Sequence, residues 1–371
     1  MAPSVATCHG RRRAAHQKSA MRDYPTQNGP KPTPGSAVRT RPQRRTDLQS
    51  SLDSRLAIKN ERVRDPPLAH STSTPHIMPT ISELFVYPIK SCAGIALNEA
   101  RVLSTGLEYD RGWMAVDSNG AMLTQRAYPR MALIKVEIAA QELVIRAPGM
   151  SELRTPLDAA LLDTAARVAT TVWRDAAYGL DTGDECAEWF SAFLGMPVRL
   201  LRSDPQRERI VDPAYTESVG GATTLFADGF PLLVIGQASL DDLNTRLNAK
   251  GAPSIPIDRF RPNLVLSGLD AYEEDYVETL RVDDATADSA QGLELRLVKL
   301  CARCPMPTID QAKGERDPNW PDEPTDTMSV YRANPQRNGA VTFGNNALVT
   351  SGAGAWLRVG QAVEAELGFG D

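Results

Sequence analysis

Histidine is scarce in this sequence of 371 residues. The four histidines are His9, His16, His70 and His76, so residues 78–371 contain none. Ser-His-Asp and Cys-His catalysis, histidine general bases and zinc sites with histidine ligands all require an imidazole. The composition therefore argues against these kinds of chemistry in most of the chain.

Cysteine is nearly as rare. The chain has five cysteines, at positions 8, 92, 186, 301 and 304. An odd, sparse set without a recognisable secretory signal does not describe a disulfide framework. We therefore expect a reduced, intracellular protein, with the cytoplasm as its location.

Several other signatures are missing. No apolar run approaches the roughly 20 residues that a membrane-spanning helix needs, so no membrane span is expected. The sequence contains no Gly-x-Gly-x-x-Gly, no phosphate-loop signature and no repeat at solenoid spacing. The sequence therefore gives little indication of a nucleotide-binding fold or a repeat architecture.

Charge is distributed unevenly. Residues 1–77 carry 14 Lys and Arg against 5 Asp and Glu, a charge of +9, which leaves −14 for the rest of the net −5. This first stretch is rich in Pro, Ser and Thr without apolar periodicity, which predicts a disordered basic extension. If it is a transit peptide, the location becomes mitochondrial. A nucleic-acid-binding tail is not expected, because interleaved aromatics are absent and the rest of the chain is acidic.

Residues 81–150 have the pattern of strands and turns. Asn119-Gly120 predicts a hairpin turn between the apolar runs 113–117 and 121–123. Pro88 predicts that the run 84–89 is an edge strand or a bulge. Residues 293–297 alternate as a half-buried strand that leads into Cys301.

Two helices are expected. Thr182 and Glu185 fit a capping box, and apolar residues at helical spacing run from Cys186 to Leu194, with Gly195 at the end. Ser239 is a good N-cap for a second helix that ends at Gly251. Taken together, the patterns predict a mainly β, α+β protein with a few packed helices.

The pair Cys301 and Cys304 is the strongest candidate for chemistry. A zinc site needs two more ligands, a thioredoxin-like pair should open a helix, and two buried structural thiols are a further alternative. Pro305 follows at once, which favours a loop. Lys299 and Arg303 lie nearby and favour a thiolate, the ligand that thiophilic metals choose. Spacing alone does not separate the two cysteines.

Several basic residues lie beside turns. Lys90-Ser91 and Arg111 follow short strands, and Arg259 and Arg261 precede the apolar run that starts at Leu264. The planar fork of arginine suits a phosphate or a pterin edge. Alone, each residue is equally a solvated charge or a partner for a neighbouring carboxylate. Their meaning depends on whether the fold brings them together.

Four segments in this order carry a family resemblance. They are Tyr87-Pro88-Ile89-Lys90-Ser91-Cys92, Asp110-Arg111-Gly112-Trp113, Phe260-Arg261-Pro262-Asn263-Leu264 and Cys301-Ala302-Arg303-Cys304. The sequence resembles a MOSC N-terminal β-barrel domain followed by a MOSC domain, in particular the amidoxime-reducing molybdenum proteins and their bacterial relatives. The resemblance covers roughly residues 79–368, with an expected division into 79–205 and 206–368.

The resemblance implies a molybdenum–molybdopterin cofactor. The matching metal ligand and catalytic residue is Cys304, and Cys301 becomes supporting structure. The positions that hold the pterin and its phosphate are matched by Lys90, Ser91, Arg111, Arg261 and Arg303. Thr308-Ile309-Asp310 matches the segment after the cysteine, and Phe343-Gly344-Asn345-Asn346 matches a late loop near the cofactor.

The resemblance also implies an activity, the reduction of N-hydroxylated compounds such as amidoximes, hydroxylamines and hydroxylated bases. Some bacterial relatives carry a ferredoxin domain, which needs four clustered cysteines. No cysteine follows Cys304, so we expect no internal iron–sulfur cluster and a separate reductase as electron donor. The membrane anchor of the mitochondrial relatives is not expected either.

Two other functions remain open. One is a MOSC-type sulfur carrier or transferase with a persulfide on Cys304, and pyridoxal phosphate is the alternative cofactor in this interpretation. A desulfurase half that would bind pyridoxal phosphate is not visible in this sequence. The other is a non-enzymatic protein that binds the molybdenum cofactor without turnover.

Overall fold

A computed structural model describes residues 76–162, 164–282 and 292–368. Most of the predicted extension 1–77 lies outside these residues. Its last two residues form strand β1 (His76–Ile77), which pairs antiparallel with β24 (Glu364–Leu367). Within the described ranges, no helix is both long and apolar enough to cross a membrane.

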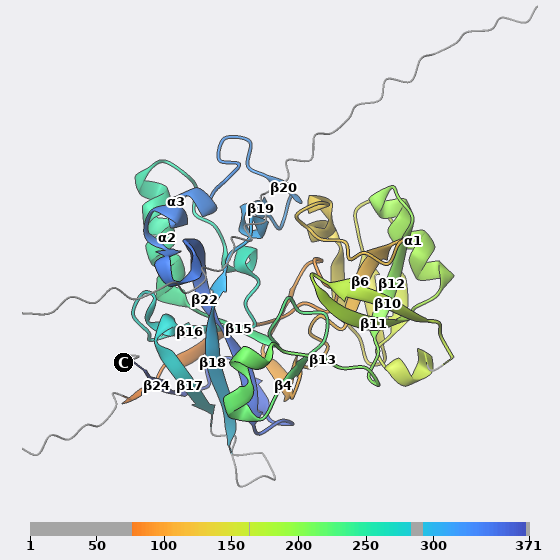
Figure 1. Ribbon diagram of the computed structural model, residues 1–371. Coiled ribbons are helices and arrows are strands. Elements are labelled where there is room, and N and C mark those ends of the chain that lie inside the picture. Colours follow the sequence, from red (N-terminus) through yellow and green to blue (C-terminus); the bar gives the residue numbers. More distant parts are fainter. Residues whose placement is uncertain (1–75, 163, 283–291, 369–371) are drawn as a thin grey trace, which may run out of the picture. The chain divides into compact units, whose positions relative to one another are not determined.

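The largest sheet of the described residues joins distant parts of the chain (Figure 1). The sheet begins with β1 and β24. The strands that follow, in order across the sheet, are β17 (Val277–Val282), β18 (Leu293–Ala302), β22 (Ala340–Ser351), β15 (Leu232–Gly236), β16 (Leu264–Ser267), β2 (Thr80–Val86) and β3 (Ile95–Leu97). β21 (Ala333–Asn334) pairs with β22 beside this path. Strands β15 and β16 are parallel because helix α2 (Gln237–Ala249) crosses between them, and the other pairs are antiparallel.

Strand alternation gives this sheet two apolar faces. Leu264 and Leu266 pack in one core, whereas Val265 packs in the other with Leu243 and Leu247 of α2. Figure 1 shows α2 and α3 (Thr325–Tyr331) beside β16 and β22. Burial on both faces explains why these strands are almost continuously apolar.

A second sheet has the order β10 (Arg167–Val172), β11 (Asp175–Asp181), β12 (Val198–Ser203) and β6 (Trp113–Asp117). Helix α1 (Asp184–Leu194) packs against β12 (Figure 1). Trp113 and Phe190 are fully buried in the shared core. Strands β7 (Lys135–Ile138), β8 (Glu142–Arg146) and β9 (Leu153–Pro156) form a third sheet against the same core.

The remaining elements are short. The strands are β4 (Glu99–Leu103), β5 (Gly106–Leu107), β13 (Arg209–Ile210), β14 (Thr223–Thr224), β19 (Ile309–Asp310), β20 (Glu315–Arg316) and β23 (Trp356–Arg358). The 3₁₀ turns are η1 (Pro129–Leu133), η2 (Ala159–Leu162), η3 (Pro213–Tyr215), η4 (Glu217–Val219), η5 (Ile257–Phe260), η6 (Glu273–Asp275), η7 (Met306–Thr308) and η8 (Pro335–Arg337).

The predicted mainly β class is confirmed, and so is the turn at Gly120, where the amide of Leu123 returns to the carbonyl of Ala115. Both predicted helices form, but both predicted N-caps are wrong. Gly183 caps α1, and the Thr182 hydroxyl instead donates to the Leu200 carbonyl. Gly236 caps α2, which places Ser239 inside the helix.

Two strand predictions are also wrong. β2 lies between β16 and β3, so it is not an edge strand. Its ladder with β16 has a register shift between Ile81 and Glu83, but Pro88 lies two residues beyond Val86, the last residue of β2, and does not cause this shift. Strand β18 continues to Ala302, so Cys301 belongs to the strand and only Cys304 lies beyond it. Both differences arise from pairing between strands that are distant in the sequence, which local sequence patterns do not predict.

Candidate functional site

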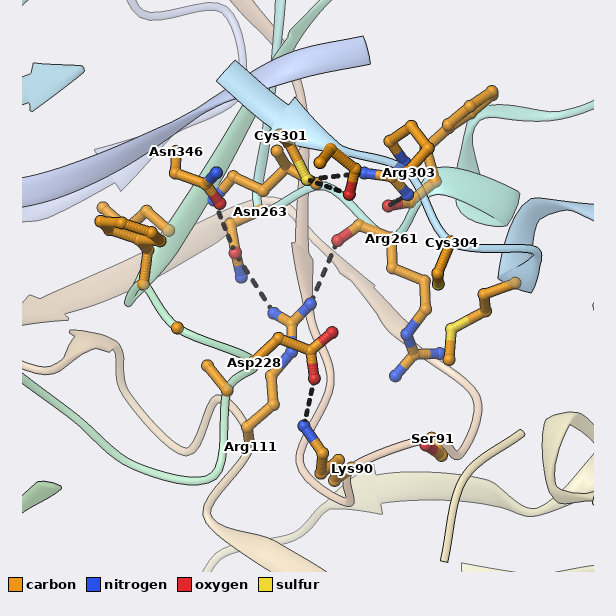
Figure 2. A pocket seen from close by; sticks show the side chains of 18 residues that line it. Lys90, Ser91, Arg111, Asp228, Arg261, Asn263, Cys301, Arg303, Cys304 and Asn346 are labelled. Carbon is orange, nitrogen blue, oxygen red and sulfur yellow. Dashed lines mark hydrogen bonds and ion pairs between the residues drawn. The ribbon is translucent and has the colours of Figure 1, made fainter. Parts of the chain in front are cut away.

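One pocket collects segments from distant parts of the chain. It measures about 730 Å³, counting space open to solvent at its mouth. Its wall is made by the segment after β2, the turn before β6, the loop before β15, the turn before β16 and the end of β18 (Figure 2). All six residues predicted from the sequence line it, namely Lys90, Ser91, Arg111, Arg261, Arg303 and Cys304.

Three of these six residues have a left-handed backbone. Their φ angles are 67° at Ser91, 48° at Arg111 and 58° at Arg261. Such conformations cost non-glycine residues about 1 to 2 kcal/mol each and persist where the surroundings impose them. Here the Arg111 amide donates to the Tyr87 carbonyl at 2.8 Å, and the Arg261 amide donates to the Asp258 carbonyl at 3.1 Å. Part of the backbone strain of the described chain therefore lies at the pocket wall.

Arg111 is fixed by neighbouring oxygen atoms. Its Nη1 lies 2.5 Å from Asp110 Oδ2 and 3.2 Å from Asn263 Oδ1, and its Nη2 donates to the Arg261 carbonyl at 3.1 Å. Asp110 also accepts the Tyr87 amide at 2.9 Å. Because a buried carboxylate already compensates its charge, Arg111 holds the wall more than it attracts a ligand.

Arg261 keeps a free donor. Its Nη1 donates to the Cys92 carbonyl at 2.6 Å, whereas its buried Nη2 has no partner among the described residues. Burial and the nearby Arg111 lower the pKa of Arg261 to about 10, so the guanidinium remains charged at neutral pH. An unpaired buried donor is costly unless a ligand satisfies it.

Arg303 joins the two cysteines to the wall. Its Nη2 donates to the Phe260 carbonyl at 2.9 Å, and its Nη1 lies 3.1 Å from Cys301 Sγ. Its buried Nε has no partner among the described residues. Both cysteines line the pocket, Cys301 from the end of β18 and in contact with the Arg303 cation, and Cys304 from the turn after the strand. Both thiols are free and half-buried.

Lys90 is already paired. Its Nζ donates to the Phe226 carbonyl at 2.8 Å and lies 2.5 Å from Asp228 Oδ1. Burial lowers the pKa of Lys90, and the Asp228 carboxylate acts in the opposite direction. Sequence reasoning missed Asp228, because Phe226-Ala227-Asp228-Gly229 is an ordinary turn sequence with nothing to indicate a site.

The late segment 343–346 reaches the pocket through its last residue. Asn346 lines the wall and donates its amide to the Lys299 carbonyl at 2.9 Å. Phe343 instead stacks on Phe260, with ring centroids 4.3 Å apart. Thr308 donates to the Pro305 carbonyl at 2.8 Å and holds the turn after Cys304.

The charges of the pocket favour an anionic ligand. Four cationic side chains line it, Lys90, Arg111, Arg261 and Arg303, against the single carboxylate of Asp228. The free donors at Arg261 Nη2 and Arg303 Nε suit phosphate or pterin oxygens. In the described part of the chain, no three Cys, His, Asp or Glu side chains cluster as metal ligands. A metal bound by Cys304 would take its other ligands from a bound molecule, which fits a metal carried by an anionic organic cofactor.

Comparison with known proteins gives the same two domains. The profile of the MOSC N-terminal beta barrel domain matches residues 78–197, and that of the MOSC domain matches residues 222–364. Mitochondrial amidoxime reducing component 2 of Bos taurus is 32% identical over 259 residues, which cover 68% of this chain and 72% of that protein. Mitochondrial amidoxime-reducing component 1 of Homo sapiens is 30% identical over 263 residues, with the same coverage of 68% and 72%.

A third relative has a different name. Molybdenum cofactor sulfurase of Oryza sativa is 31% identical over 305 residues, which cover 76% of this chain but 35% of that longer protein. The expected family resemblance is confirmed by these matches. The chain belongs to the family of proteins in which a MOSC N-terminal β-barrel domain precedes a MOSC domain, the family of the mitochondrial amidoxime-reducing components.

Proposed function

We propose that this protein is a molybdenum-cofactor-dependent oxidoreductase that reduces N-hydroxylated compounds. The observation that carries the proposal is the convergence of the Cys304 thiol with four cationic side chains on one pocket. The names of the animal relatives, amidoxime-reducing components, support amidoximes as substrates, and we extend the proposed class to hydroxylamines and hydroxylated bases. Electrons come from a separate reductase.

In this proposal, different residues of the pocket contribute to cofactor binding in different ways. Cys304 would ligate the metal, and the free donors of Arg261 and Arg303 would hold the anionic part of the cofactor. Arg111 positions Arg261 through its contact with the Arg261 carbonyl, and Ser91 contributes its turn to the wall. When bound, the cofactor supplies two-electron redox chemistry at its metal. The pocket residues fix its orientation and the access of substrate.

The activity is tested with protein expressed where the molybdenum cofactor is made. Reduced methyl viologen should drive conversion of benzamidoxime to benzamidine by the wild type. Cys304→Ala should abolish this turnover, and Cys186→Ala serves as control because Cys186 is buried in the α1 core away from the pocket. Molybdenum-loaded wild type that turns over no N-hydroxylated substrate would refute the reductase.

The rice relative supports one other candidate function, sulfur transfer. A nucleophilic Cys304 would carry a persulfide received from a pyridoxal phosphate enzyme. Mass spectrometry of metal-free protein after incubation with a cysteine desulfurase and cysteine separates the two candidates. Persulfide on Cys304 without reductase turnover supports transfer, whereas tight cofactor binding with neither activity supports a carrier.

The location of the protein is part of the proposal. We propose the cytoplasm, with the mitochondrion as the alternative if residues 1–77 are a transit peptide. The animal relatives are named as mitochondrial proteins, so this alternative merits a direct test. A fusion of residues 1–77 to a fluorescent protein should remain in the cytoplasm on the first account and enter mitochondria on the second.

A further inference from the structure

A buried tyrosine lies behind the pocket wall. Tyr87 follows the last residue of β2 and is 1% exposed, and in the described chain it is not part of the pocket lining. The guanidinium groups of two lining residues lie over its ring. The guanidinium carbon is 4.4 Å from the ring centroid for Arg111 and 4.2 Å for Arg261. One aromatic ring therefore contacts two of the four cations of the pocket.

The ring of Tyr87 is held in place by its neighbours. The Tyr87 amide donates to Asp110 Oδ1 at 2.9 Å, and the ring stacks on Phe85 with centroids 6.4 Å apart. At Gly94, an added Cβ would lie 2.4 Å from Tyr87 Cε1, closer than real side chains pack. Gly94 does not have a positive φ angle, so the close approach of the ring, and not the backbone, requires this glycine.

The hydroxyl of Tyr87 does not explain the position of the ring. Tyr87 Oη is buried and has no hydrogen-bond partner among the described residues. Burial raises the pKa of Tyr87, and the two arginines act in the opposite direction. The phenol is therefore neutral and offers the arginines no anionic charge. What remains is the face of the ring, whose negative quadrupole attracts a guanidinium.

The two arginines depend on the ring to different degrees. Arg111 also contacts the Asp110 carboxylate at 2.5 Å, whereas Arg261 forms no ion pair with a carboxylate of the described residues. A carboxylate partner would cancel the charge of Arg261 and occupy its donors. The ring face stabilises the cation without occupying an N–H group, which leaves Arg261 Nη2 for an anion.

We propose that Tyr87 is a positioning residue for the anion site, because its ring face holds the Arg261 guanidinium in place of a carboxylate. Arg261 thereby keeps its charge and a free donor for a ligand. The shared ring also fixes Arg111, whose Nη2 donates to the Arg261 carbonyl (Figure 2). The inference rests on the proposed function, because the anion in question is the anionic part of the proposed cofactor.

The test measures pyrophosphate binding to the metal-free protein by isothermal titration calorimetry. Tyr87→Phe keeps the ring face and should bind pyrophosphate within about twofold of the wild type. Tyr87→Leu keeps a buried apolar side chain but removes the ring. It should bind roughly tenfold more weakly, the loss expected for a desolvated cation–π contact. A tyrosine that only filled the core would lower thermal stability on replacement and leave the affinity unchanged.

Two further variants complete the design. Gly94→Ala leaves Tyr87 in the sequence but displaces its ring, so this variant should also lose affinity for pyrophosphate. Tyr178→Leu is the matched control, because the Arg207 guanidinium carbon lies 4.4 Å from the Tyr178 ring centroid and Tyr178 does not line this pocket in the described chain. The control should bind pyrophosphate as tightly as the wild type.

Equal pyrophosphate affinity in Tyr87→Leu and wild type would overturn the proposal, and so would a wild type that binds no pyrophosphate. An equal loss in Tyr87→Phe would overturn it too, because the hydroxyl and not the ring face would then matter. If Tyr87→Leu does not fold, the comparison of Gly94→Ala with Tyr87→Phe decides. The reductase is judged separately by viologen-driven turnover of benzamidoxime. Protein with the expected affinities but no turnover would retain the role of Tyr87 and lose the proposed function.

Discussion

The arginines of the pocket have different roles although they share one chemistry. Arg111 is compensated by Asp110, whereas Arg261 and Arg303 each keep a buried donor without a partner among the described residues. We therefore expect anion binding to depend mainly on Arg261 and Arg303. We expect Lys90 to contribute less to anion binding, because it already forms an ion pair with Asp228.

Arg261→Lys tests this division of roles. A lysine keeps the charge but loses the planar fork and the free Nη2 donor, so pyrophosphate should bind the metal-free variant more weakly. A tenfold loss of affinity removes about 1.4 kcal/mol of ligand-induced stabilisation at saturating ligand. Thermal unfolding with and without pyrophosphate measures the difference.

The control for this experiment is Arg316→Lys, at an exposed pair with Asp322. Pyrophosphate should stabilise this variant as much as the wild type. An equal pyrophosphate response in Arg261→Lys would show that the free donor does not bind anions.

At the scale of elements, close packing of β22 against β15 depends on one glycine. Gly344 has a φ angle of 75°, and an added Cβ would lie 2.7 Å from Ile235 Cγ1 and 2.8 Å from the Val234 carbonyl oxygen. Both contacts are tighter than real side chains allow. The glycine permits β22 to carry Asn346 to the pocket wall two residues later.

Gly344→Ala should therefore destabilise the protein more than a left-handed backbone alone explains. The left-handed conformation and the overpacking together should cost about 2 to 5 kcal/mol. Gly339→Ala is the matched control, because its φ is also 75° but nothing lies within 4 Å of the added Cβ. It should cost about 1 to 2 kcal/mol in urea unfolding. Equal losses would show that the packing at Gly344 relaxes.

A buried carboxylate joins helix α2 to strand β22. Glu274 is fully buried, accepts the Ser239 hydroxyl at 2.7 Å, and its carbonyl accepts the Asn345 amide at 3.2 Å. Burial raises the pKa of Glu274, and the hydrogen bond from Ser239 acts in the opposite direction. The folded protein therefore holds the proton on Glu274 more tightly than the unfolded chain does.

This preference makes stability depend on pH. A raised folded-state pKa contributes stability that is present below the ordinary value of 4.5 and is lost as pH rises toward the folded-state pKa. Glu274→Gln should remove this contribution to the pH dependence of stability. As pH rises from the unfolded-state pKa of Glu274 to its folded-state pKa, the free energy of unfolding of the variant should increase relative to that of the wild type by about 1.4 kcal/mol per pH unit. Urea unfolding at pH 5 and pH 8 measures it.

The exposed Glu278 provides the control, since Glu278→Gln should follow the wild type at both pH values. A difference between Glu274→Gln and wild type that does not change with pH would contradict the burial argument.

At the scale of the whole molecule, the sequence predicts the composition of the fold better than its connections. Alternating apolar residues identify β18, and apolar residues at helical spacing identify α1. The assembly of the site depends instead on pairs such as Asn263 and Phe85, which are 178 residues apart and joined by a side-chain hydrogen bond. Local propensity contains no information about such pairs.

The family motifs compensate for this missing information. Each motif alone is an ordinary turn with a basic residue, and their common order is what predicts that they converge. Asp228 and Trp173 lie outside the motifs, so the contacts of Asp228 with Lys90 and with Trp173 appear only in the folded chain. The left-handed backbone at Arg111 likewise accompanies a hydrogen bond to the Tyr87 carbonyl, which lies outside the local sequence.

The division of the chain at residue 205 stays a prediction. Strands β2 and β3, which precede this point, belong to the same sheet as β15, β16 and β22, which follow it. The large sheet therefore ties the two stretches of sequence together. Lys90, which follows β2, and Arg261, which precedes β16, reach the same pocket for this reason.

The assignment of Cys304 as the metal ligand is the central claim, and metal analysis tests it most directly. Wild type, Cys304→Ala and Cys301→Ala would be purified from a host that makes the molybdenum cofactor, and their molybdenum content would be measured by mass spectrometry. The account predicts stoichiometric molybdenum in the wild type, loss of it in Cys304→Ala and retention of most of it in Cys301→Ala. A wild type without molybdenum, or a Cys304→Ala variant that keeps it, would contradict the account.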